Sequence, residues 1–540
     1  MNRRAFLRLA ALTGMTAFST PTLSTVRAAS PATRPGKKVK PFELDEMSIA
    51  QLQDLMAHGN ASAVSLVKKY QARIEAIDRH GPRLNAVMEL NPDALAIAAA
   101  LDKERAFRGA RGPLHGVPVF IKDNIDTHDR MTTTAGSLAL AGSIPPRDSF
   151  VAARLRAAGA VLLGKTNLSE WANFRGSLST SGWSGRGGQT LNPYVLDRNP
   201  SGSSSGSAVA VASNLCAVAV GTETDGSIIS PASFNGIVGI KPTLGLISRS
   251  GIIPIAHSQD TAGPMARTVA DAAILLGALA GTDARDPATA EASAKAEKDY
   301  SRCLDVNAIR GARLGVARSF FGAHPKVDEL MESALGQLKR LGAELVEGIT
   351  LKKSAELEKA EGEVLHYEMK ADMNAYLASL GPQATIRTLK EIIEFNKGHK
   401  EAELVWFGQE ELIASEAKGP LTEKAYLDAL ATCKRLARTE GIDAAMNKDN
   451  LDAIVAPTST PAHVTDWVLG DHGLGDSTTY AAVAGYPSIT VPAGQVFELP
   501  VGISFFGRAW SEPKLLGIAF AFEQATKGRR PPRFLATIAG

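Results

Sequence analysis

Residues 201–228 read SGSSSGSAVAVASNLCAVAVGTETDGSI, and this stretch decides the fold class. Its first part is rich in glycine and serine, a composition typical of flexible linkers. The tract then runs directly into small apolar residues, which predict a helix followed by a strand over 207–224. The tract is therefore either a joint between two domains or a segment buried beside a site.

The same alternation of helix and strand continues on both sides of this stretch. Residues 116–127 predict a buried strand with Lys122 near its end, and residues 149–170 predict a helix and then a strand. The remaining expected elements are amphipathic helices at 47–59 and 62–82 and strands at 451–460 and 486–494. This pattern favours a layered α/β fold.

The domain organisation follows from what separates these elements. We find no repeat of 20 to 50 residues, and no glycine, serine or proline tract divides the chain into self-sufficient halves. We therefore predict one large domain over residues 44–540. The segment at about 300–430 is rich in lysine, glutamate and leucine and predicts a helical elaboration of that domain, whereas residues 29–43 predict a loose lead-in.

The N-terminal residues 1–28 have the anatomy of an export signal. Arg3 and Arg4 are followed by a short apolar run and then by small residues ending at Ala28. The RRAFLR order resembles a twin-arginine signal, which exports folded proteins. The apolar run is too short and too polar for a membrane span. The sequence therefore predicts an exported bacterial protein, periplasmic or secreted, without stable membrane insertion.

Composition excludes several classes of protein. The chain has 44% hydrophobic and 21% charged residues, as soluble globular proteins do. Four of its 59 basic residues lie within 1–28, so the mature chain has 55 against 56 acidic residues and no charge pattern for nucleic acid. Cys216, Cys303 and Cys433 fit neither a disulfide framework nor a zinc site. We expect no metal and no cofactor. The oligomeric state stays open, with a monomer favoured.

Two short patterns are candidates for nucleophilic or base chemistry. Ser204 is the centre of a GSSSG match to the nucleophile elbow, but Pro200 makes the preceding residues a poor central strand, so chance explains this match. Lys122 ends an apolar strand, and burial would lower its pKa enough for it to accept a proton from a hydroxyl. By local sequence alone, a lysine that reaches solvent or pairs with Asp123 or Asp126 is the better interpretation.

The turn GTETDGS, residues 221–227, is the third candidate. A turn of this kind can direct several backbone N–H groups at one point, as a developing oxyanion requires. Glu223 and Asp225 also raise the alternative of a carboxylate pair for glycoside or metal chemistry. His257 and His463 lie in loops outside any pattern of a serine–histidine triad, so we expect structural roles for them.

Taken together, these stretches resemble the amidase signature family. The family core reads G-G-S-S-G-G-S, then a small-residue helix, then G-T-D-x-G-G-S-I, and here Ser203 and Ser227 keep its spacing of 24 residues. Other family blocks follow in order over residues 45–525: LHGVPVFIKDNIDT, GKTNLSEWAN, GQTLNP, FNGIVGIKPTLGLISRSGIIP, SQDTAGPMARTVADAA, LDAIVAPT, AGYPSITVPAG and GISFFGRAWSEPKLLGIAFAFE. The resemblance implies a central mixed twisted sheet with helices on both faces.

The resemblance also implies a catalytic triad and reverses the interpretation of Lys122. Ser227 would attack the amide carbonyl, and Ser203, which follows a cis peptide bond in the family, would relay the proton. The resemblance thus implies that the serine tract is packed around this bond and is not a hinge. Lys122, neutral in the free enzyme, would accept this proton and return it to the leaving ammonia or amine.

The backbone N–H groups of Thr224, Asp225, Gly226 and Ser227 would form the oxyanion hole. This chain departs from the family pattern at two positions near the nucleophile. Asp225 replaces a glycine, which would be strained if its φ were positive, and Ile229 stands where the family often has arginine.

The resemblance is strongest to bacterial peptide amidases, which release ammonia from the C-terminal carboxamide of peptides. The GTETDGS variant and the export signal both favour this substrate, and Ser177 and Ser179 are weak candidates for the acyl pocket. A broad aliphatic, aryl or fatty-acid amidase is the alternative, although residues 300–430 lack an apolar run typical of a membrane-binding cap. An exported protein cannot serve tRNA charging. A non-catalytic amidase-like binding protein is the alternative from another class.

Overall fold

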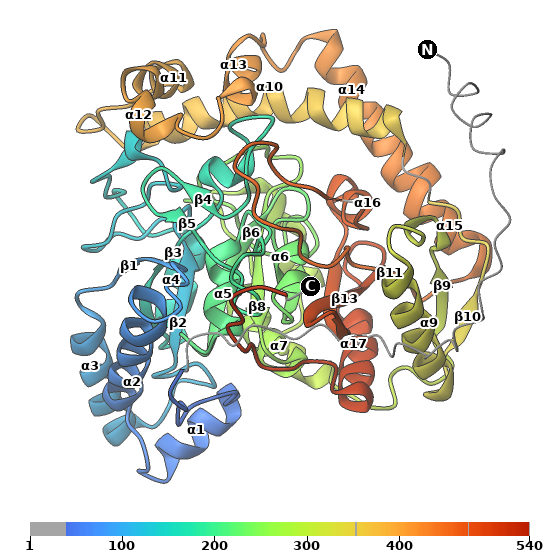
Figure 1. Ribbon diagram of the computed structural model, residues 1–540, viewed down its shortest axis with the longest axis horizontal. Helices are drawn as coiled ribbons and strands as arrows, with labels where there is room; N and C mark the ends of the chain where they lie inside the picture. Colours follow the sequence, from blue (N-terminus) through green and yellow to red (C-terminus); the bar gives the residue numbers. More distant parts are fainter. Residues whose placement is uncertain (1–38, 352–353, 474, 539–540) are drawn as a thin grey trace, which may run out of the picture.

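The computed structural model describes residues 39–351, 354–473 and 475–538, and within them one large sheet runs through the molecule (Figure 1). The predicted signal peptide and most of the lead-in lie outside the described residues. Across the sheet, the eleven strands of the described residues are β1 (Val87–Leu90), β3 (Val161–Thr166), β2 (Pro118–Lys122), β6 (Val218–Glu223), β8 (Thr261–Ala266), β7 (Val238–Lys241), β12 (Ser488–Val496), β13 (Leu499–Phe506), β11 (Ala453–Pro457), β9 (Arg313–Val316) and β10 (Glu344–Val346). A small ribbon of β4 (Trp183–Ser184) and β5 (Gly188–Gln189) lies apart from it.

The sheet is mixed, as the family resemblance implies. Strand β2 runs parallel to both β3 and β6, and β9 runs parallel to both β10 and β11. The pairs between these two groups are antiparallel. Parallel neighbours need a crossover between them, and helices of the chain provide it here.

Helices cover the sheet and its ends, and the α-helices of the described residues have the following bounds. They are α1 (Ile49–Ala57), α2 (Ala63–Ile74), α3 (Ala94–Arg108), α4 (Phe150–Ala157), α5 (Ser205–Ala212), α6 (Ile229–Phe234), α7 (Val269–Leu279), α8 (Ala292–Lys295), α9 (Pro325–Arg340), α10 (Ala355–Ser379), α11 (Leu389–Gly398), α12 (Lys400–Glu403), α13 (Glu410–Glu416), α14 (Lys424–Lys434), α15 (Asp443–Asp449), α16 (Thr479–Ala484) and α17 (Glu512–Thr526). None of the helices in the described part of the chain has the length and apolar character to span a membrane.

Strand β13 shows how the two faces of the sheet differ. Phe505 points toward α17, where its ring lies 5.9 Å from that of Phe522. The preceding residue, Ser504, points the opposite way and is hydrogen-bonded to Thr458 at 2.8 Å. On that second face Ser233 of α6 accepts a hydrogen bond from the Gly502 N–H at 2.9 Å. Helices therefore lie on both faces, and the predicted fold class is confirmed.

The predicted helices near the N-terminus are present and begin where the sequence indicates. Ser48 and Ser62 each form a capping box at the start of α1 and α2. The second helix is extended by a π-helical turn at Glu75–Arg79 and so ends close to the predicted Gly81–Pro82.

The segment 300–430 is mainly helical but contains two strands that we did not predict. Strands β9 and β10 flank α9 and form one edge of the sheet, so this part belongs to the α/β layer. The helices α10 to α14 then form an arc along one side of the molecule (Figure 1). The elaboration outside the sheet is thus shorter than predicted and begins at α10.

Candidate active site

Lys122 is the last residue of β2 and is fully buried between β3 and β6. Its Nζ atom is hydrogen-bonded to Ser203 Oγ at 2.7 Å. It also donates to Oγ1 of Thr222 at 2.9 Å and to the Thr222 carbonyl at 3.3 Å. Thr222 lies on β6, so two parallel neighbouring strands hold the lysine. The local alternative, a strand-end lysine that reaches solvent, is wrong.

The burial of Lys122 changes its protonation. Loss of hydration lowers the pKa of the ammonium from 10.5 to about 7, although Asp260 and Glu223 act in the opposite direction. A neutral amine has two N–H groups and one lone pair. In the neutral form the two N–H groups can donate to the two oxygens of Thr222, which leaves the lone pair directed at the Ser203 hydroxyl.

The serine tract leads into α5 and is buried from Ser203 onward. The Gly202–Ser203 peptide bond is cis. The Ser203 carbonyl accepts a hydrogen bond from the Ser169 N–H at 3.1 Å. Gly202 has no room for a side chain, because a Cβ there would collide with Ser169 Oγ and lie 3.2 Å from Ser181 Oγ. The tract is therefore a packed part of the fold, as predicted, and not a hinge.

Ser204 has a structural role that its place in the GSSSG pattern does not indicate. Its Oγ donates to the Thr222 carbonyl at 3.0 Å and accepts from the Thr222 N–H at 3.1 Å. This side chain is buried and satisfies the backbone at the end of β6. The elbow interpretation, already disfavoured by Pro200, has no support in this geometry.

Ser227 follows β6 in the turn that the sequence singled out, and it is nearly buried. The Ser204 N–H donates to the Ser227 carbonyl at 3.1 Å, which joins this turn to the serine tract. Glu223 accepts hydrogen bonds from the N–H groups of Ile228 and Ile229 at 2.7 and 3.0 Å. The turn is thereby fixed from both sides, with Ser203 and Ser227 on adjoining segments.

Asp225 departs from the family glycine without backbone strain. The left-handed conformation falls on Gly226, with a φ of 75°, and not on Asp225. Burial and the neighbouring Asp476 raise the pKa of Asp225 to about 7, and Thr479 donates to its carboxyl at 2.7 Å. Because Glu223 and Asp225 bind different parts of the chain, the geometry does not favour the alternative of a paired-carboxylate site.

Sequence reasoning missed three residues that complete this site. Thr222 holds the lysine, and Asn124 donates to its Oγ1 at 3.0 Å. Asp260 accepts from the Thr224 hydroxyl at 2.6 Å, and burial raises the pKa of Asp260 to about 6. A pocket of about 390 Å³ opens beside Asn124, Thr222, Thr224 and Asp260. The pairing of β6 with β2 brings Asn124 to Thr222, and its pairing with β8 brings Asp260 to Thr224; no local sequence pattern indicates either pairing.

Comparison with known proteins agrees with this arrangement. The chain matches the Amidase family model over residues 65–516. A probable amidase from Arabidopsis thaliana is 44% identical over 505 residues, which cover 92% of this chain and 93% of that protein. The chain belongs to the amidase family. It is therefore an amidase of the α/β class with a mixed central sheet.

Two solved structures are also similar to this amidase over nearly its whole length. The native peptide amidase from Stenotrophomonas maltophilia is 52% identical with a TM-score of 0.87, covering 92% of this chain and 100% of that one. The peptide amidase PAM in complex with the competitive inhibitor chymostatin is 52% identical with a TM-score of 0.88, covering 91% and 100%.

The two weak substrate-binding candidates lie in a loop of the amidase near the serine tract. Ser177 is exposed, and its N–H donates to Glu410 at 3.2 Å. The Ser179 hydroxyl donates to Asn173 at 2.9 Å. Within this loop it is Ser181 that approaches Gly202, so the serine closest to the tract was not among the predicted ones.

The two histidines take part in local contacts. His257 is hydrogen-bonded to Asp372 at 2.8 Å, which raises the pKa of its imidazole, and it lies 3.4 Å from Glu368. These three side chains could together contact a cation. Glu368, however, already accepts hydrogen bonds from Tyr426 and from the Ser258 N–H. We therefore interpret the cluster as an ion pair between His257 and Asp372. His463 contacts the Val464 carbonyl at 3.0 Å.

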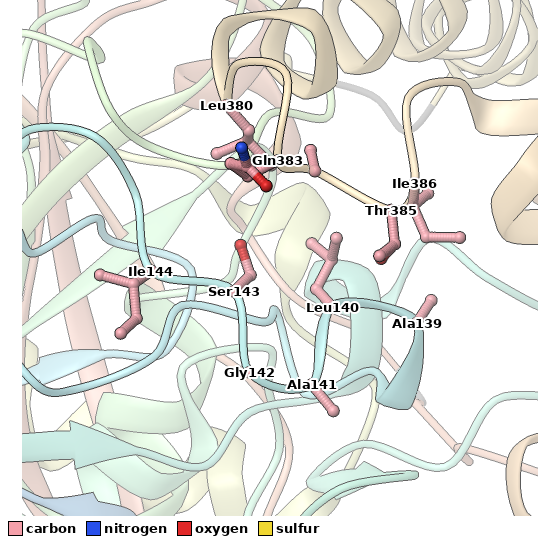
Figure 2. A pocket seen from close by; sticks show the side chains of 11 residues that line it. Ala139, Leu140, Ala141, Gly142, Ser143, Ile144, Leu380, Gln383, Thr385 and Ile386 are labelled. Atoms are coloured by element: carbon pink, nitrogen blue, oxygen red, sulfur yellow. The ribbon is translucent and has the colours of Figure 1, made fainter.

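A second pocket of the amidase, of about 290 Å³, lies between two loops (Figure 2). Residues 139–144 form one wall, and residues 380–386, which connect α10 with α11, form the other. Figure 2 shows Ser143 and Gln383 pointing into the space between the loops. Neither Lys122 nor the two candidate serines line this pocket, so we do not assign the chemistry to it.

Proposed function

We propose that the amidase hydrolyses amides with Ser227 as nucleophile, Ser203 as proton relay and Lys122 as base. The observation that carries the proposal is the 2.7 Å hydrogen bond between Lys122 Nζ and Ser203 Oγ, next to the turn that presents Ser227. A serine hydroxyl is a weak nucleophile and needs a base to remove its proton. A lysine with a pKa of about 7 is suited to that task near neutral pH.

The reaction then proceeds in two stages. Ser227 Oγ bonds to the carbonyl carbon while its proton passes to Ser203, whose own proton passes to Lys122. When the C–N bond breaks, the proton returns through Ser203 to the leaving nitrogen, which departs as ammonia and leaves an acyl ester on Ser227. A water molecule attacks this ester by the same relay and releases the carboxylic acid.

The turn before the nucleophile would stabilise the charge that develops on the carbonyl oxygen. We assign the backbone N–H groups of Thr224, Asp225, Gly226 and Ser227 to this oxyanion hole. The buried Glu223 supports the assignment, because its hydrogen bonds to the residues after Ser227 fix the turn before substrate arrives.

We further propose that the substrate is the C-terminal carboxamide of a peptide. The identity of 52% with peptide amidases, over more than 90% of this chain, supports this class above others. A broad aliphatic, aryl or fatty-acid amidase of the same family is the alternative. A non-catalytic binding protein is disfavoured, because the buried lysine and its bond to Ser203 have no evident use in binding alone.

Ammonia release from three substrates tests the proposed function. We expect a peptide amide to be hydrolysed with a higher kcat/KM than a free fatty amide and a simple aryl amide. A preference for the fatty or aryl amide would replace the peptide substrate with the alternative. Absence of hydrolysis with all three, by a folded protein, would favour the binding protein.

A further inference from the structure

Five apolar side chains are gathered at the surface near the serine tract, and we call them the aromatic platform: Leu178, Trp406, Trp467, Val468 and Leu469. Val468 is 78% exposed and Trp406 is 47% exposed. The rings of Trp406 and Trp467 lie 4.5 Å apart, although these residues come from different segments of the chain. Exposed apolar groups clustered in this way mark binding surfaces more often than scattered ones do. The sequence did not predict this cluster.

The segment that carries Trp406 packs on the buried side chain of Arg175. Arg175 is fully buried and lies 4.1 Å from the ring centroid of Phe407 and 5.0 Å from that of Trp183. It also forms ion pairs with Glu170 and Glu403. A buried arginine paired with carboxylates and stacked on two rings fixes the chain on either side of Trp406.

The loop that carries Trp467, Val468 and Leu469 is bonded to the serine tract. The carbonyl of His463 accepts from the Asn199 N–H at 2.8 Å. Asp471 accepts from the Ser181 hydroxyl at 2.5 Å and from the Asn199 side chain at 3.2 Å. Ser181, together with Ser169 and Ser205, surrounds Gly202, the residue before Ser203.

The chain segment that follows this loop contacts the turn that precedes Ser227. Thr479, at the start of α16, donates to Asp225 at 2.7 Å, two residues before Ser227. The carbonyl of Leu178, the remaining platform residue, packs against Gly470. Both ends of the loop that carries the platform are therefore hydrogen-bonded to segments that flank the candidate active site.

The proposed reaction itself says on which side of the scissile bond further contacts must be made. The leaving group of a C-terminal carboxamide is ammonia, so nothing extends beyond it. Any binding energy from remote parts of the substrate must come from the acyl side, which is the peptide chain before the amide. An extended peptide advances by about 3.5 Å per residue, so a few residues carry it well away from Ser227.

We propose that the aromatic platform is an extended subsite that binds apolar side chains upstream of the C-terminal carboxamide of a peptide substrate. The inference rests on the proposed peptide amidase function. Tryptophan provides large contact area with little loss of side-chain freedom, and it is enriched among residues that dominate binding. An apolar and aromatic platform selects peptides with aromatic or aliphatic residues at those positions.

Two substrates and two variants test this proposal. One substrate is a dipeptide amide, and the other is a pentapeptide amide with the same last two residues and two phenylalanines at its start. We expect Trp406→Ala together with Trp467→Ala to lower kcat/KM for the pentapeptide amide by tenfold or more, mainly through KM. The dipeptide amide lacks the upstream residues that the platform is proposed to bind, so its kcat/KM should change by less than twofold. Phe107→Ala, which removes an 88% exposed ring on α3, is the matched control and should change neither value.

Three other results would contradict the platform, the proposed function or both. Hydrolysis of both peptides by the double variant with no selective loss for the pentapeptide overturns the platform alone and leaves the proposed function standing. No hydrolysis of either peptide by the wild type overturns the proposed function and the platform with it. If the double variant instead loses binding to anionic phospholipid vesicles while it keeps the pentapeptide activity, the platform is a membrane-docking surface and the proposal is wrong.

Discussion

At the scale of single residues, the site depends on a lysine whose pKa the fold lowers to about 7. Lys122 is surrounded by hydroxyl and carbonyl oxygens of Ser203 and Thr222, and no carboxylate among the described residues is hydrogen-bonded to it. A carboxylate in direct contact would favour the ammonium and raise the pKa. Asp260 and Glu223 act on it only at a distance, so burial dominates.

The pKa of Lys122 predicts the pH dependence of the amidase. Its folded pKa of about 7 lies below the usual 10.5, so the base is protonated and inactive on the acid side. We expect kcat/KM to fall about tenfold per pH unit below pH 7 and to level off above it. A profile for ammonia release measured from pH 5 to 9 checks this, and constant activity down to pH 5 would rule out the lysine base.

A substitution at the same residue gives the size of its contribution. We expect Lys122→Ala to lower kcat by roughly 10²–10⁴-fold, the range typical of a positioned base. Asp225→Asn is the matched control, because it removes the other nearby group with a pKa of about 7, which lies in the turn before Ser227. The fall of kcat/KM below pH 7 should persist in Asp225→Asn. If the fall is absent in that variant, the titrating group is Asp225 and not Lys122.

The neighbouring serines of the tract separate chemistry from structure. We expect Ser203→Ala to abolish most of the activity with little change in stability. Ser204→Ala should instead lower the free energy of unfolding by about 1–3 kcal/mol, because it removes the hydroxyl that accepts from the buried Thr222 N–H and donates to the Thr222 carbonyl. Denaturant unfolding and ammonia release on both variants provide the comparison. An inactive but stable Ser204→Ala would restore the elbow interpretation.

At the scale of elements, the serine tract and α5 form a tightly packed unit. Gly202 has no space for a Cβ, whereas Gly362 in α10 has no heavy atom within 4 Å of one. We therefore expect Gly202→Ala to destabilise the protein and to lower kcat/KM together. Gly362→Ala should stabilise it by about 0.5–1 kcal/mol, because alanine is the better helix former. Thermal unfolding of the two variants measures both, and equal effects would show that the tract is not closely packed.

Sequence patterns predicted the elements with local signals and missed those without them. Ser48 and Ser62 identify the starts of α1 and α2 through their capping boxes, which are local. Strands β9 and β10 are only four and three residues long, and they exist because β11, more than a hundred residues later, pairs with β9. Pairing with a distant strand produces no recognisable pattern in a strand of three or four residues. The lysine, glutamate and leucine around β9 and β10 therefore predict a helical segment.

At the scale of the whole molecule, the sheet brings the candidate residues to one place. Lys122 ends β2, and Ser227 follows β6, its parallel neighbour, so both lie at the carboxyl ends of parallel strands. Ligand sites of α/β proteins form at these ends. The order of family motifs predicted Lys122, Ser203 and Ser227 as candidates. The contacts of Thr222, Asn124 and Asp260 depend on the order of the strands in the sheet, which local sequence patterns do not predict.

The export signal is a prediction for the whole chain. We propose that residues 1–28 direct the amidase through the twin-arginine pathway and that the mature protein begins after Ala28. Expression of the full chain in a bacterium, followed by N-terminal sequencing of the protein outside the cytoplasm, should give Ala29 as first residue. Arg3→Lys with Arg4→Lys should keep the protein in the cytoplasm at its full length, and unchanged export of that variant would contradict the signal.

The most direct test of the account is covalent labelling of the nucleophile. The amidase is treated with a fluorophosphonate probe, digested, and mapped by mass spectrometry, with Ser227→Ala and Ser204→Ala treated in parallel. We predict one adduct on Ser227 in the wild type and in Ser204→Ala, and none in Ser227→Ala. An adduct on Ser204, or no adduct on a protein that still releases ammonia from a peptide amide, would contradict the proposed triad.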